Sequence, residues 1–395
     1  MTQVSPYYLD NASTTRLHPR VLEAMLPWMR GEAANPSSIH RFGREARVAV
    51  ERARESVAAL ICAHPSEIVF TSGGTESNNT AIHFALAGTE QNAHVLTSPA
   101  EHQAVLQPLA NRRHSVVSML PVDRGAVPSP DDTERALRSD TVLIALMHAN
   151  NETGGLLDVA AVSDVLHGYT GLLFCDMVQS AGKVPLRIHD TRIDLASLSA
   201  HKLHGPQGIG ALYMRRGLDF RPMILGGAQE RARRGGTEAV AAIVGFGEAA
   251  RLALEERETR YATWVRLREQ LLRRLRDGVP GIVENVSVRT LPNIVSVTLP
   301  YAHYPIDGGM LLVDLDLRGC AVSAGSACTA GSIEPSHVMR AIGHDEHSAR
   351  SSVRFSFGAF TEAETVERGA EVFVRSVQDM VERSSSRSHS RKAIP

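Results

Sequence analysis

The chain has 395 residues, of which 43% are hydrophobic and 22% are charged, and its formal net charge is −1. This composition is typical of a globular protein with a large core, and it lacks the basic excess of a protein that binds nucleic acid directly. The N-terminus does not have the pattern of a signal peptide and no apolar run approaches 18 residues, so we expect a cytoplasmic protein with no membrane partner.

Helical patterns alternate with short apolar runs over the first two thirds of the chain. Residues 46–61 place apolar side chains three and four positions apart, which predicts a helix with one buried face. Short apolar runs predict strands at 67–72, 94–98, 141–150, 172–176, 193–199 and 208–214. The alternation indicates an α/β fold with a mostly parallel sheet covered by helices, in which ligands gather at the carboxyl ends of the strands.

The pattern changes over the last third of the chain. A helix is expected to end at Gly278, and alternating residues predict half-buried strands at 293–300 and 351–358. Thr361 followed by Glu364 predicts a capping box at the start of the last helix.

These patterns divide the chain into two domains. We expect a large domain that carries the ligand site at 16–260, and a small α+β domain built from 1–15 and 261–383. The segment 384–395 is rich in serine and arginine and has no acidic residue, so we expect it to be disordered.

The four cysteines, at positions 62, 175, 320 and 328, are too few for a disulfide framework. Cys62 and Cys175 lie in apolar patterns, which predicts buried, unreactive thiols. Cys328 lies in the run VSAGSACTAGS at 322–332, whose glycines and small residues predict a pliable loop. From this run alone, an incidental surface thiol and a reactive thiol on a flexible tether are about equally good interpretations.

Lys202 follows a predicted strand and precedes a Gly/Pro turn in SAHKLHGPQG. A lysine at a strand end is usually a solvated charge, but a buried lysine with a lowered pKa can form a Schiff base with an aldehyde cofactor. Pyridoxal phosphate also requires an acid beside its pyridinium nitrogen, and Asp176 ends the predicted strand LLFCD. The turn TSGGTESNN leads from a strand into a helix, and the N-terminus of a helix can bind a phosphate group.

Six segments occur in order and at compatible separations, namely AEHQAV, HANNETG, DMVQSAGK, SAHKLHGPQGIGALY, ERARRGGTEAV and SAGSACTAGS. With YLDNASTT and NPSSIH near the start, they resemble the cysteine desulfurases, which are pyridoxal-phosphate enzymes of fold type I, related to class V aminotransferases, that convert L-cysteine into L-alanine. The resemblance runs from about residue 7 to about residue 375. It implies a large domain with a mostly parallel seven-stranded sheet flanked by helices, which binds the cofactor, and a smaller α+β domain that carries the mobile cysteine loop. The loop is of the longer kind found in the branch that serves general iron–sulfur assembly.

The resemblance also implies roles for individual residues. In SAHK, Lys202 would bind the cofactor covalently and move protons at the α-carbon of the substrate, while Ser199 and His201 would hold the phosphate. In DMVQ, Asp176 would pair with the ring nitrogen and Gln179 would hydrogen-bond the ring hydroxyl.

Further roles carry over from the other motifs. His102 in AEHQ would stack on the ring and take part in proton transfer, and Gly74 and Thr75 would hold the phosphate. Thr237 in RGGTEAV would reach the phosphate of the other subunit, which implies an obligate homodimer. Asn151 would contact the cofactor, and the candidates for binding the substrate carboxylate are Asn151, Arg354 and Asn35, the last of which could equally cap a turn before Pro36.

In this resemblance Cys328 is the nucleophile. Its thiolate would attack the sulfur of bound L-cysteine, and the resulting persulfide would pass to an acceptor such as an iron–sulfur scaffold or a tRNA-thiolation enzyme. A free thiol of pKa about 8.5 is only a few per cent ionised near neutral pH, so we expect His102 or the substrate amine to assist its deprotonation. Cys320 is the rival thiol. We assign no metal site, although Cys328 could act as a transient iron–sulfur ligand during transfer.

The chain departs from the family pattern at several positions, including Gln207, where many relatives have a lysine. We expect this difference to change surface charge and hence the choice of acceptor.

Other functions on the same fold stay open. A selenocysteine lyase or a small-amino-acid aminotransferase would share Lys202 and Asp176 but would need no loop cysteine, so Cys328→Ala separates these enzymes from a desulfurase. A non-catalytic sulfur-relay subunit would keep the fold and would not bind the cofactor. A redox-sensing thiol protein is a third option, for which the sequence near Cys328 offers no resolving cysteine.

Overall fold

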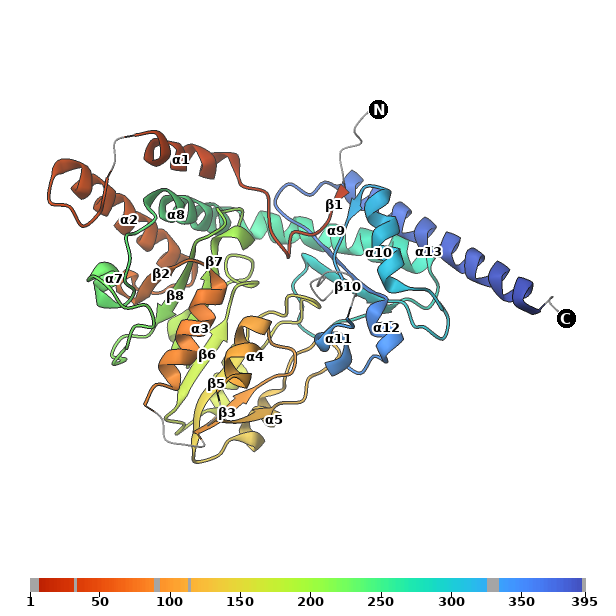
Figure 1. Cartoon of the computed structure of the whole chain (residues 1–395), viewed down its shortest axis with the longest axis horizontal. Coiled ribbons are helices and arrows are strands. Elements are labelled where there is room, and N and C mark those ends of the chain that lie inside the picture. Colours follow the sequence, from red (N-terminus) through yellow and green to blue (C-terminus); the bar gives the residue numbers. More distant parts are fainter. Residues whose placement is uncertain (1–6, 32–33, 89–92, 113–114, 325–333, 393–395) are drawn as a thin grey trace.

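The computed structural model describes residues 7–31, 34–88, 93–112, 115–324 and 334–392, the last nine of these by their backbone alone. Figure 1 shows two lobes side by side, one built around a large sheet and the other around a small sheet. None of the helices within the described ranges is both long and apolar enough to cross a bilayer.

The first lobe contains a seven-stranded sheet, as expected. In spatial order its strands are β2 (Ile68–Thr71), β8 (Gly210–Met214), β7 (Leu195–Ser199), β6 (Leu172–Asp176), β5 (Thr141–Met147), β3 (Ala93–Thr97) and β4 (Ser115–Met119). Only β8 runs antiparallel to its neighbours, β2 and β7, and the other adjacent pairs are parallel. The central strands read as near-continuous apolar runs because helices cover both faces of the sheet.

The two faces of this sheet bury alternate residues of each strand. Phe70 and Leu146 pack on one face with α1 (Pro19–Arg30), α2 (Arg41–Leu60), α6 (Val159–Val165) and α8 (Val240–Glu255). Val69 and Ala145, their neighbours in sequence, pack on the other face with α3 (Gly74–Ala85) and α4 (Gln103–Ala110). The short helices α5 (Pro130–Ala136) and α7 (Gln229–Ala232) complete the lobe.

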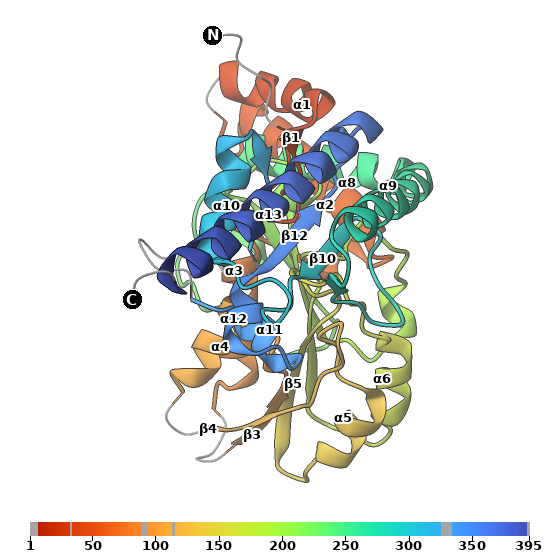
Figure 2. The same cartoon turned by 90° about the vertical axis from the view of Figure 1, so that its right-hand side faces the viewer.

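The second lobe is an α+β unit around an antiparallel sheet in the order β12 (Ser352–Ser356), β10 (Ile294–Thr298) and β9 (Val283–Glu284). Its helices are α9 (Arg257–Gly278), α10 (Gly308–Leu317), α11 (His337–Ala341), α12 (Glu346–Arg350) and α13 (Ala363–Lys392). Figure 2 shows α13 crossing this lobe between α9 and α10. The N-terminal strand β1 (Tyr7–Tyr8) pairs in parallel with β11 (Cys320–Ala321), so the start of the chain associates with this lobe. The domain boundary at 260 stays a prediction, because α9 begins at Arg257 and runs across it.

Several expectations about local structure are wrong. Strand β4 was not anticipated, because it is a short, partly exposed edge strand that lacks a continuous apolar run. The capping box is wrong because α13 begins at Ala363, and the Thr361 hydroxyl accepts the Gly358 N–H instead. Helix α13 continues to Lys392, so the backbone is helical over 384–392, where we expected disorder, while 393–395 lie outside the described residues.

Candidate active site

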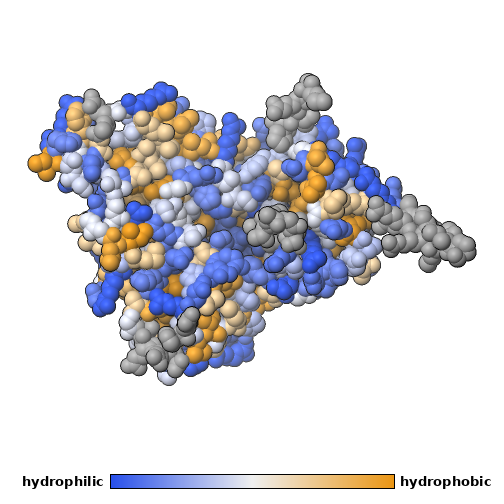
Figure 3. All heavy atoms as spheres, viewed as in Figure 1, coloured by the Kyte–Doolittle hydropathy of each residue, from blue (hydrophilic) through white to orange (hydrophobic). Residues whose placement is uncertain are grey.

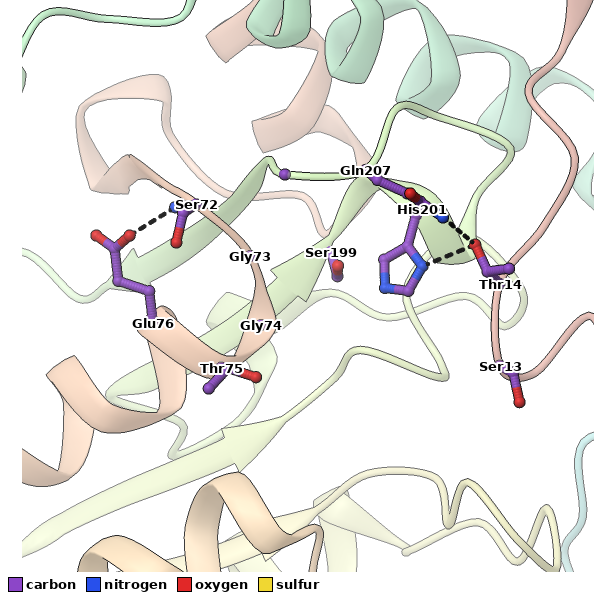
Figure 4. Close-up of a pocket in the computed structure, with 11 residues that line it drawn as sticks. Ser13, Thr14, Ser72, Gly73, Gly74, Thr75, Glu76, Ser199, His201 and Gln207 are labelled. Carbon is purple, nitrogen blue, oxygen red and sulfur yellow. Dashed lines mark hydrogen bonds between the residues drawn. The ribbon is translucent and has the colours of Figure 1, made fainter. Parts of the chain in front are cut away.

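Polar residues collect at the carboxyl ends of β2, β6 and β7, which meet at one edge of the large sheet. A pocket of about 410 Å³ opens there, lined by Ser13, Thr14, Ser72, Gly73, Gly74, Thr75, Glu76, Ser199, His201, Gln207 and Gly208. Figure 4 shows these residues converging from three parts of the chain, with His201 and Gln207 both directed at Thr14. Gly74, Thr75, Ser199 and His201, which the sequence analysis assigned to the phosphate, therefore share one pocket.

The turn into α3 has the features of an anion site. Gly73 has φ 155°, a conformation that a side chain would strain, and a Cβ on Gly74 would lie 2.7 Å from a methyl carbon of Val178. Helix α3 then begins at Gly74 without a side-chain cap for its first N–H groups, and the residues of this first turn, Gly74, Thr75 and Glu76, line the pocket. Glu76 would oppose an anion, but Arg234 pairs with it at 3.0 Å and neutralises its charge. These residues fit the phosphate of the expected cofactor.

His201 is a neutral hydrogen-bonding group at this pocket. Burial, together with the charges of Lys202 and Lys183, lowers its pKa to about 4. Its Nδ1 lies 3.1 Å from the Thr14 hydroxyl, which also accepts the Gln207 side-chain N–H at 3.3 Å. The expectation that Gln207 affects only surface charge is therefore too narrow, because this side chain lines the pocket.

Lys202 lies in the short 3₁₀ turn Ala200–Lys202, directly after β7. Its Nζ donates to the backbone carbonyls of Ala12 and Ser13, both at 2.6 Å. Burial and the Arg354 charge lower the pKa of Lys202 to about 8, although the charges of Asp10 and Asp176 act in the opposite direction. A sizeable fraction of this amine is therefore neutral near pH 7.5, as a nucleophile for an aldehyde must be.

Asp176 is a buried carboxylate that the structure holds in one orientation. Its Oδ2 accepts the Asn78 side-chain N–H at 2.7 Å, and its Oδ1 accepts the Val178 backbone N–H at 3.0 Å. Three residues later, the Gln179 side-chain N–H donates to the Ala12 carbonyl at 2.8 Å, which brings this amide to the carbonyl that also binds Lys202. Lysine and amide thus share one carbonyl, and the charge of Asp176 acts on Lys202, so the structure holds the lysine and the acid that pyridoxal phosphate requires.

His102 is the N-cap of α4, and its Nδ1 accepts the Ala104 backbone N–H at 3.0 Å. Desolvation lowers its pKa even though part of the ring is exposed; Asp176 raises the pKa, and Lys202 and His337 lower it. These electrostatic contributions place His102 close to the lysine and the acid. Because Nδ1 is the acceptor of the cap bond, the neutral ring carries its proton on Nε2 and can donate it. To act as a base at Nε2, the ring would have to give up the cap.

Arg354 on β12 brings the second lobe to the site. Its side chain is 5% exposed, and it donates to the Asn151 carbonyl at 2.6 Å, to the Asp10 carboxylate at 2.8 Å and to the Ser13 hydroxyl at 2.7 Å. Its buried Nε has no hydrogen-bond partner within the described residues. These three hydrogen bonds use three of the five N–H groups, so one N–H on Nε and one on Nη1 are left without a partner among the described residues, and the guanidinium does not present the open fork expected from the sequence.

Like Lys202, Asp176 and His102, the predicted residues Asn35 and Thr237 are not among the residues that line the pocket. Asn35 is exposed and its side-chain oxygen accepts the Ser37 N–H at 2.9 Å, so within this chain it caps a turn. Thr237 is exposed, on a segment that follows Arg234. Neither residue reaches the phosphate site of its own chain.

The cysteines divide by exposure. Cys320 is 1% exposed and burial raises its pKa to about 12, so it is a poor nucleophile. Cys175 is buried, and burial raises its pKa well above the ordinary value, with Asp176 and Glu101 raising it further. Cys62 is exposed, so the expectation that it is buried is wrong. Cys328 lies outside the described residues.

Several residues of the site were not predicted from the sequence. Asn78 lies one helical turn after Gly74, and this spacing could have identified it as a partner of a neighbouring strand end. Ser13 and Thr14 belong to the segment YLDNASTT, which was noted without a role for any of its residues. Lys183 was overlooked although the chain has only three lysines.

Comparison with known proteins agrees with this geometry. A family model described as aminotransferase class-V matches residues 7–368. A protein called cysteine desulfurase IscS from Dictyoglomus turgidum is 42% identical over 377 residues, which cover 94% of this chain and 95% of the relative. A solved structure described as a NifS-like protein superimposes with a TM-score of 0.86 at 34% identity and covers 94% of this chain and 98% of its own. A structure described as SspA in complex with cysteine has a TM-score of 0.75 at 33% identity and covers 89% and 98% of the two chains.

Proposed function

Since this chain belongs to the aminotransferase class-V family and is a pyridoxal-phosphate-dependent cysteine desulfurase, we propose how its own residues divide the work. Lys202, Asp176, Gln179 and His102 hold and activate the cofactor, and Cys328 receives the sulfur. The observation that carries the assignment is Lys202, a half-buried amine with a lowered pKa, which follows His201 of the anion site directly in sequence and feels the charge of the oriented Asp176 carboxylate.

When bound, pyridoxal phosphate supplies a ring that withdraws electrons from the α-carbon of the amino acid. Asp176 would pair with the ring nitrogen, and its negative charge would keep that nitrogen protonated. Lys202, freed from the Ala12 and Ser13 carbonyls, accepts the proton from the α-carbon and returns it later. His102 donates from Nε2, in keeping with its capped Nδ1.

The sulfur step leaves a persulfide on Cys328. The thiolate of Cys328 attacks the substrate sulfur, so a sulfur–sulfur bond forms and the Cβ–S bond breaks. The electron pair of the broken bond stays with Cβ, which gains a proton and becomes the methyl group of alanine. L-Cysteine and one enzyme thiol thus yield L-alanine and one enzyme persulfide, with no external oxidant or reductant.

Arg354 and Asn151 are proposed to bind the substrate carboxylate. The unpaired Nε of Arg354 provides one charge-assisted donor, and the hydrogen bond from Arg354 to the Asn151 carbonyl keeps the two residues together. Asn35 would join this site only from a second subunit, because its side chain caps a turn in its own chain.

We further propose a homodimer. Apolar side chains are exposed on α1 and on loops of the large lobe, where Met29 is 62%, Ile39 89% and Leu225 81% exposed. Figure 3 shows apolar atoms gathered over α1 and α2 on this face. Exposed apolar area of this kind is typical of a subunit interface. Burying it against a second copy would also give the exposed Thr237 a phosphate site to reach, that of the partner.

The sulfur acceptor is proposed to be an iron–sulfur scaffold or a tRNA-thiolation enzyme in the cytoplasm. The support is the likeness over nearly the full chain to proteins called cysteine desulfurase IscS. We propose no direct nucleic-acid contact, because the net charge of −1 gives no basic surplus.

The test measures alanine and sulfide formation from L-cysteine by the holoenzyme. Lys202→Ala is expected to abolish both products. Cys328→Ser is expected to lower them by at least a hundredfold while the protein keeps its bound cofactor. Turnover by Cys328→Ser at the wild-type rate would reject the persulfide and favour a lyase or aminotransferase mechanism. A wild-type protein that binds no cofactor would favour a non-catalytic subunit.

A further inference from the structure

Lysine is rare in this protein. Of 42 lysine and arginine residues only three are lysines, at positions 183, 202 and 392. Lys392 is the last residue of α13, whereas Lys183 and Lys202 line the same small cavity behind the active site. Arginine thus provides nearly all of the positively charged side chains of this protein. A lysine retained at 183 points to a property that arginine lacks, namely a compact amine that can lose its proton.

Lys183 is buried in the active-site network. Its side chain is 5% exposed, and its Nζ donates to the Gln179 side-chain oxygen at 3.1 Å. Gln179 in turn donates its side-chain N–H to the Ala12 carbonyl at 2.8 Å, and this carbonyl also accepts from Lys202. The buried Lys183 and the half-buried Lys202 are therefore joined through one amide and one carbonyl.

These contacts fix the orientation of the Gln179 amide. The Ala12 carbonyl can only accept, so the NH₂ group must face it, and the amide oxygen is left facing Lys183. An NH₂ group carries two hydrogens, and the bond to Ala12 uses one of them. The second remains available to a ligand in the pocket.

Without Lys183, the amide oxygen would be buried and unpaired. The free-energy penalty would favour a rotation of the side chain toward another donor. Burial, together with the charges of Lys202 and Arg354, lowers the pKa of Lys183 to about 7. A neutral amine still donates a hydrogen bond, so Lys183 can support Gln179 without adding a third full charge beside Lys202 and Arg354. An arginine could not do this, because it stays charged.

We propose that Lys183 is a positioning residue, which holds the Gln179 amide so that its second N–H points to the ring hydroxyl of pyridoxal phosphate. The inference rests on the proposed role of Gln179 in binding that hydroxyl. It assigns no chemistry to Lys183 itself, which acts only through its neighbour.

The experiment measures the dissociation constant of pyridoxal phosphate and the absorption maximum of the bound cofactor. The variants are Lys183→Met, which keeps the length of the side chain but has no donor, and Lys183→Gln, which keeps a donor without charge. Both are made in the wild-type and Gln179→Ala backgrounds, and thermal melts of the cofactor-free proteins monitor folding.

Lys183→Met is expected to weaken cofactor binding about tenfold, the typical effect of one lost hydrogen bond, and to shift the absorption maximum. Lys183→Gln should stay within about threefold of wild type. In the Gln179→Ala background, Lys183→Met should have no further effect on binding, because the two residues act as one unit. The melts separate binding from stability, since a packing role alone would lower the melting temperature without moving the absorption maximum.

Two results would overturn the inference. One is a Lys183→Met variant with the wild-type affinity and spectrum. The other is a tenfold loss that persists in the Gln179→Ala background, which would show that Lys183 does not act through Gln179. Failure of the wild-type protein to bind pyridoxal phosphate would instead contradict the cofactor assignment. This outcome differs from the two above because it appears without any substitution.

Discussion

The side-chain amide of Asn78 donates to the Asp176 carboxylate at 2.7 Å and so joins the first turns of α3 to the end of β6. One end of α3 would thus serve two parts of the cofactor: its N-terminus lines the pocket proposed for the phosphate, and Asn78, one turn later, orients the acid proposed to pair with the ring. The distance between the phosphate site and the acid is therefore set by a single rigid element. The other contact to the Asp176 side chain comes from Val178, two residues along the chain.

Asn78→Ala is expected to weaken cofactor retention about tenfold and to lower the free energy of unfolding by about 1–2 kcal/mol, because a buried carboxylate loses a donor. Asn79→Ala is the matched control, since Asn79 lies on the same helix and bonds only to the Thr75 carbonyl at 2.9 Å. Equilibrium dialysis and thermal melts check both variants. Equal cofactor retention by the two variants would contradict the role given to Asn78.

Lys183 predicts a dependence of stability on pH. Its pKa is about 7 in the folded protein and 10.5 in an ordinary environment, so between these values the unfolded chain binds a proton that the folded chain does not. Stability must therefore rise with pH in this window, by up to about 1.4 kcal/mol per pH unit. Other titratable groups lie near Lys183. Lys202 titrates in the same pH range, whereas His201 and His204 have pKa values of about 4 and are therefore neutral throughout it. Arg354 stays charged, as arginine does at any of these pH values.

The measurement compares cofactor-free wild type with Lys183→Met by urea unfolding at pH 7 and pH 9. The stability of wild type relative to the variant is expected to increase by about 2 kcal/mol over this interval. Taking a difference removes the contributions of Lys202 and of the buried cysteines and tyrosines, which both proteins share. Parallel pH profiles would show that Lys183 keeps its proton in the folded protein.

The sequence predicted the parts of the site that depend on local order along the chain. Lys202 and Asp176 end buried strands, and Gly74 begins a helix, so alternation of strands and helices was sufficient to bring them to one edge of the sheet. Arg354 was predicted as a binding group, but its pairing with Asp10, 344 positions away, could not be read from either segment. The sheet of the second lobe creates that contact.

Other features depended on side-chain geometry that a one-dimensional pattern does not contain. His102 was predicted as a proton-transfer group, but its role as the N-cap of α4, which fixes the tautomer, follows only from the structure. Cys62 follows an apolar helix pattern, and it is exposed because the chain leaves α2 there with φ 54°. Thr361 had the right spacing for a cap, but α13 begins two residues later and its hydroxyl accepts from Gly358.

Thiol reactivity should follow burial among the described cysteines. Iodoacetamide at pH 8 is expected to label Cys62 in the native protein, whereas Cys175 and Cys320 should react only after unfolding, because burial raises the pKa of both thiols. Peptide mass spectrometry reads the sites. Cys320→Ala should keep alanine formation within about twofold of wild type, as should the control Cys62→Ala. Rapid native labelling of Cys320, or an inactive Cys320→Ala that is still folded, would restore Cys320 as a candidate nucleophile.

A buried ion pair holds a strained turn close to the proposed dimer face. Glu230 and the next two residues have φ values of 47°, 59° and 62°, a left-handed conformation that costs about 1 kcal/mol or more per non-glycine residue. Arg54 on α2 binds both carboxylate oxygens of Glu230 at 2.7 Å, and the Phe70 backbone N–H donates to the same carboxylate at 2.8 Å. Seven residues beyond Glu230 lies Thr237, so the pair fixes where that segment leaves the lobe.

Glu230→Gln is expected to lower the free energy of unfolding by about 3–5 kcal/mol, because it leaves the Arg54 charge buried without its counterion. Glu51→Gln is the matched control; Glu51 also pairs with Arg54, but its side chain is 43% exposed, so the expected loss is below about 1 kcal/mol.

Ala232→Gly should stabilise the protein by up to about 1 kcal/mol, because glycine adopts the left-handed conformation without strain. Urea unfolding measures all three, and size-exclusion chromatography reports the dimer. If the turn positions Thr237 for the partner subunit, Glu230→Gln should shift the protein toward monomer at concentrations where Glu51→Gln stays dimeric; an unchanged dimer would confine the ion pair to folding stability.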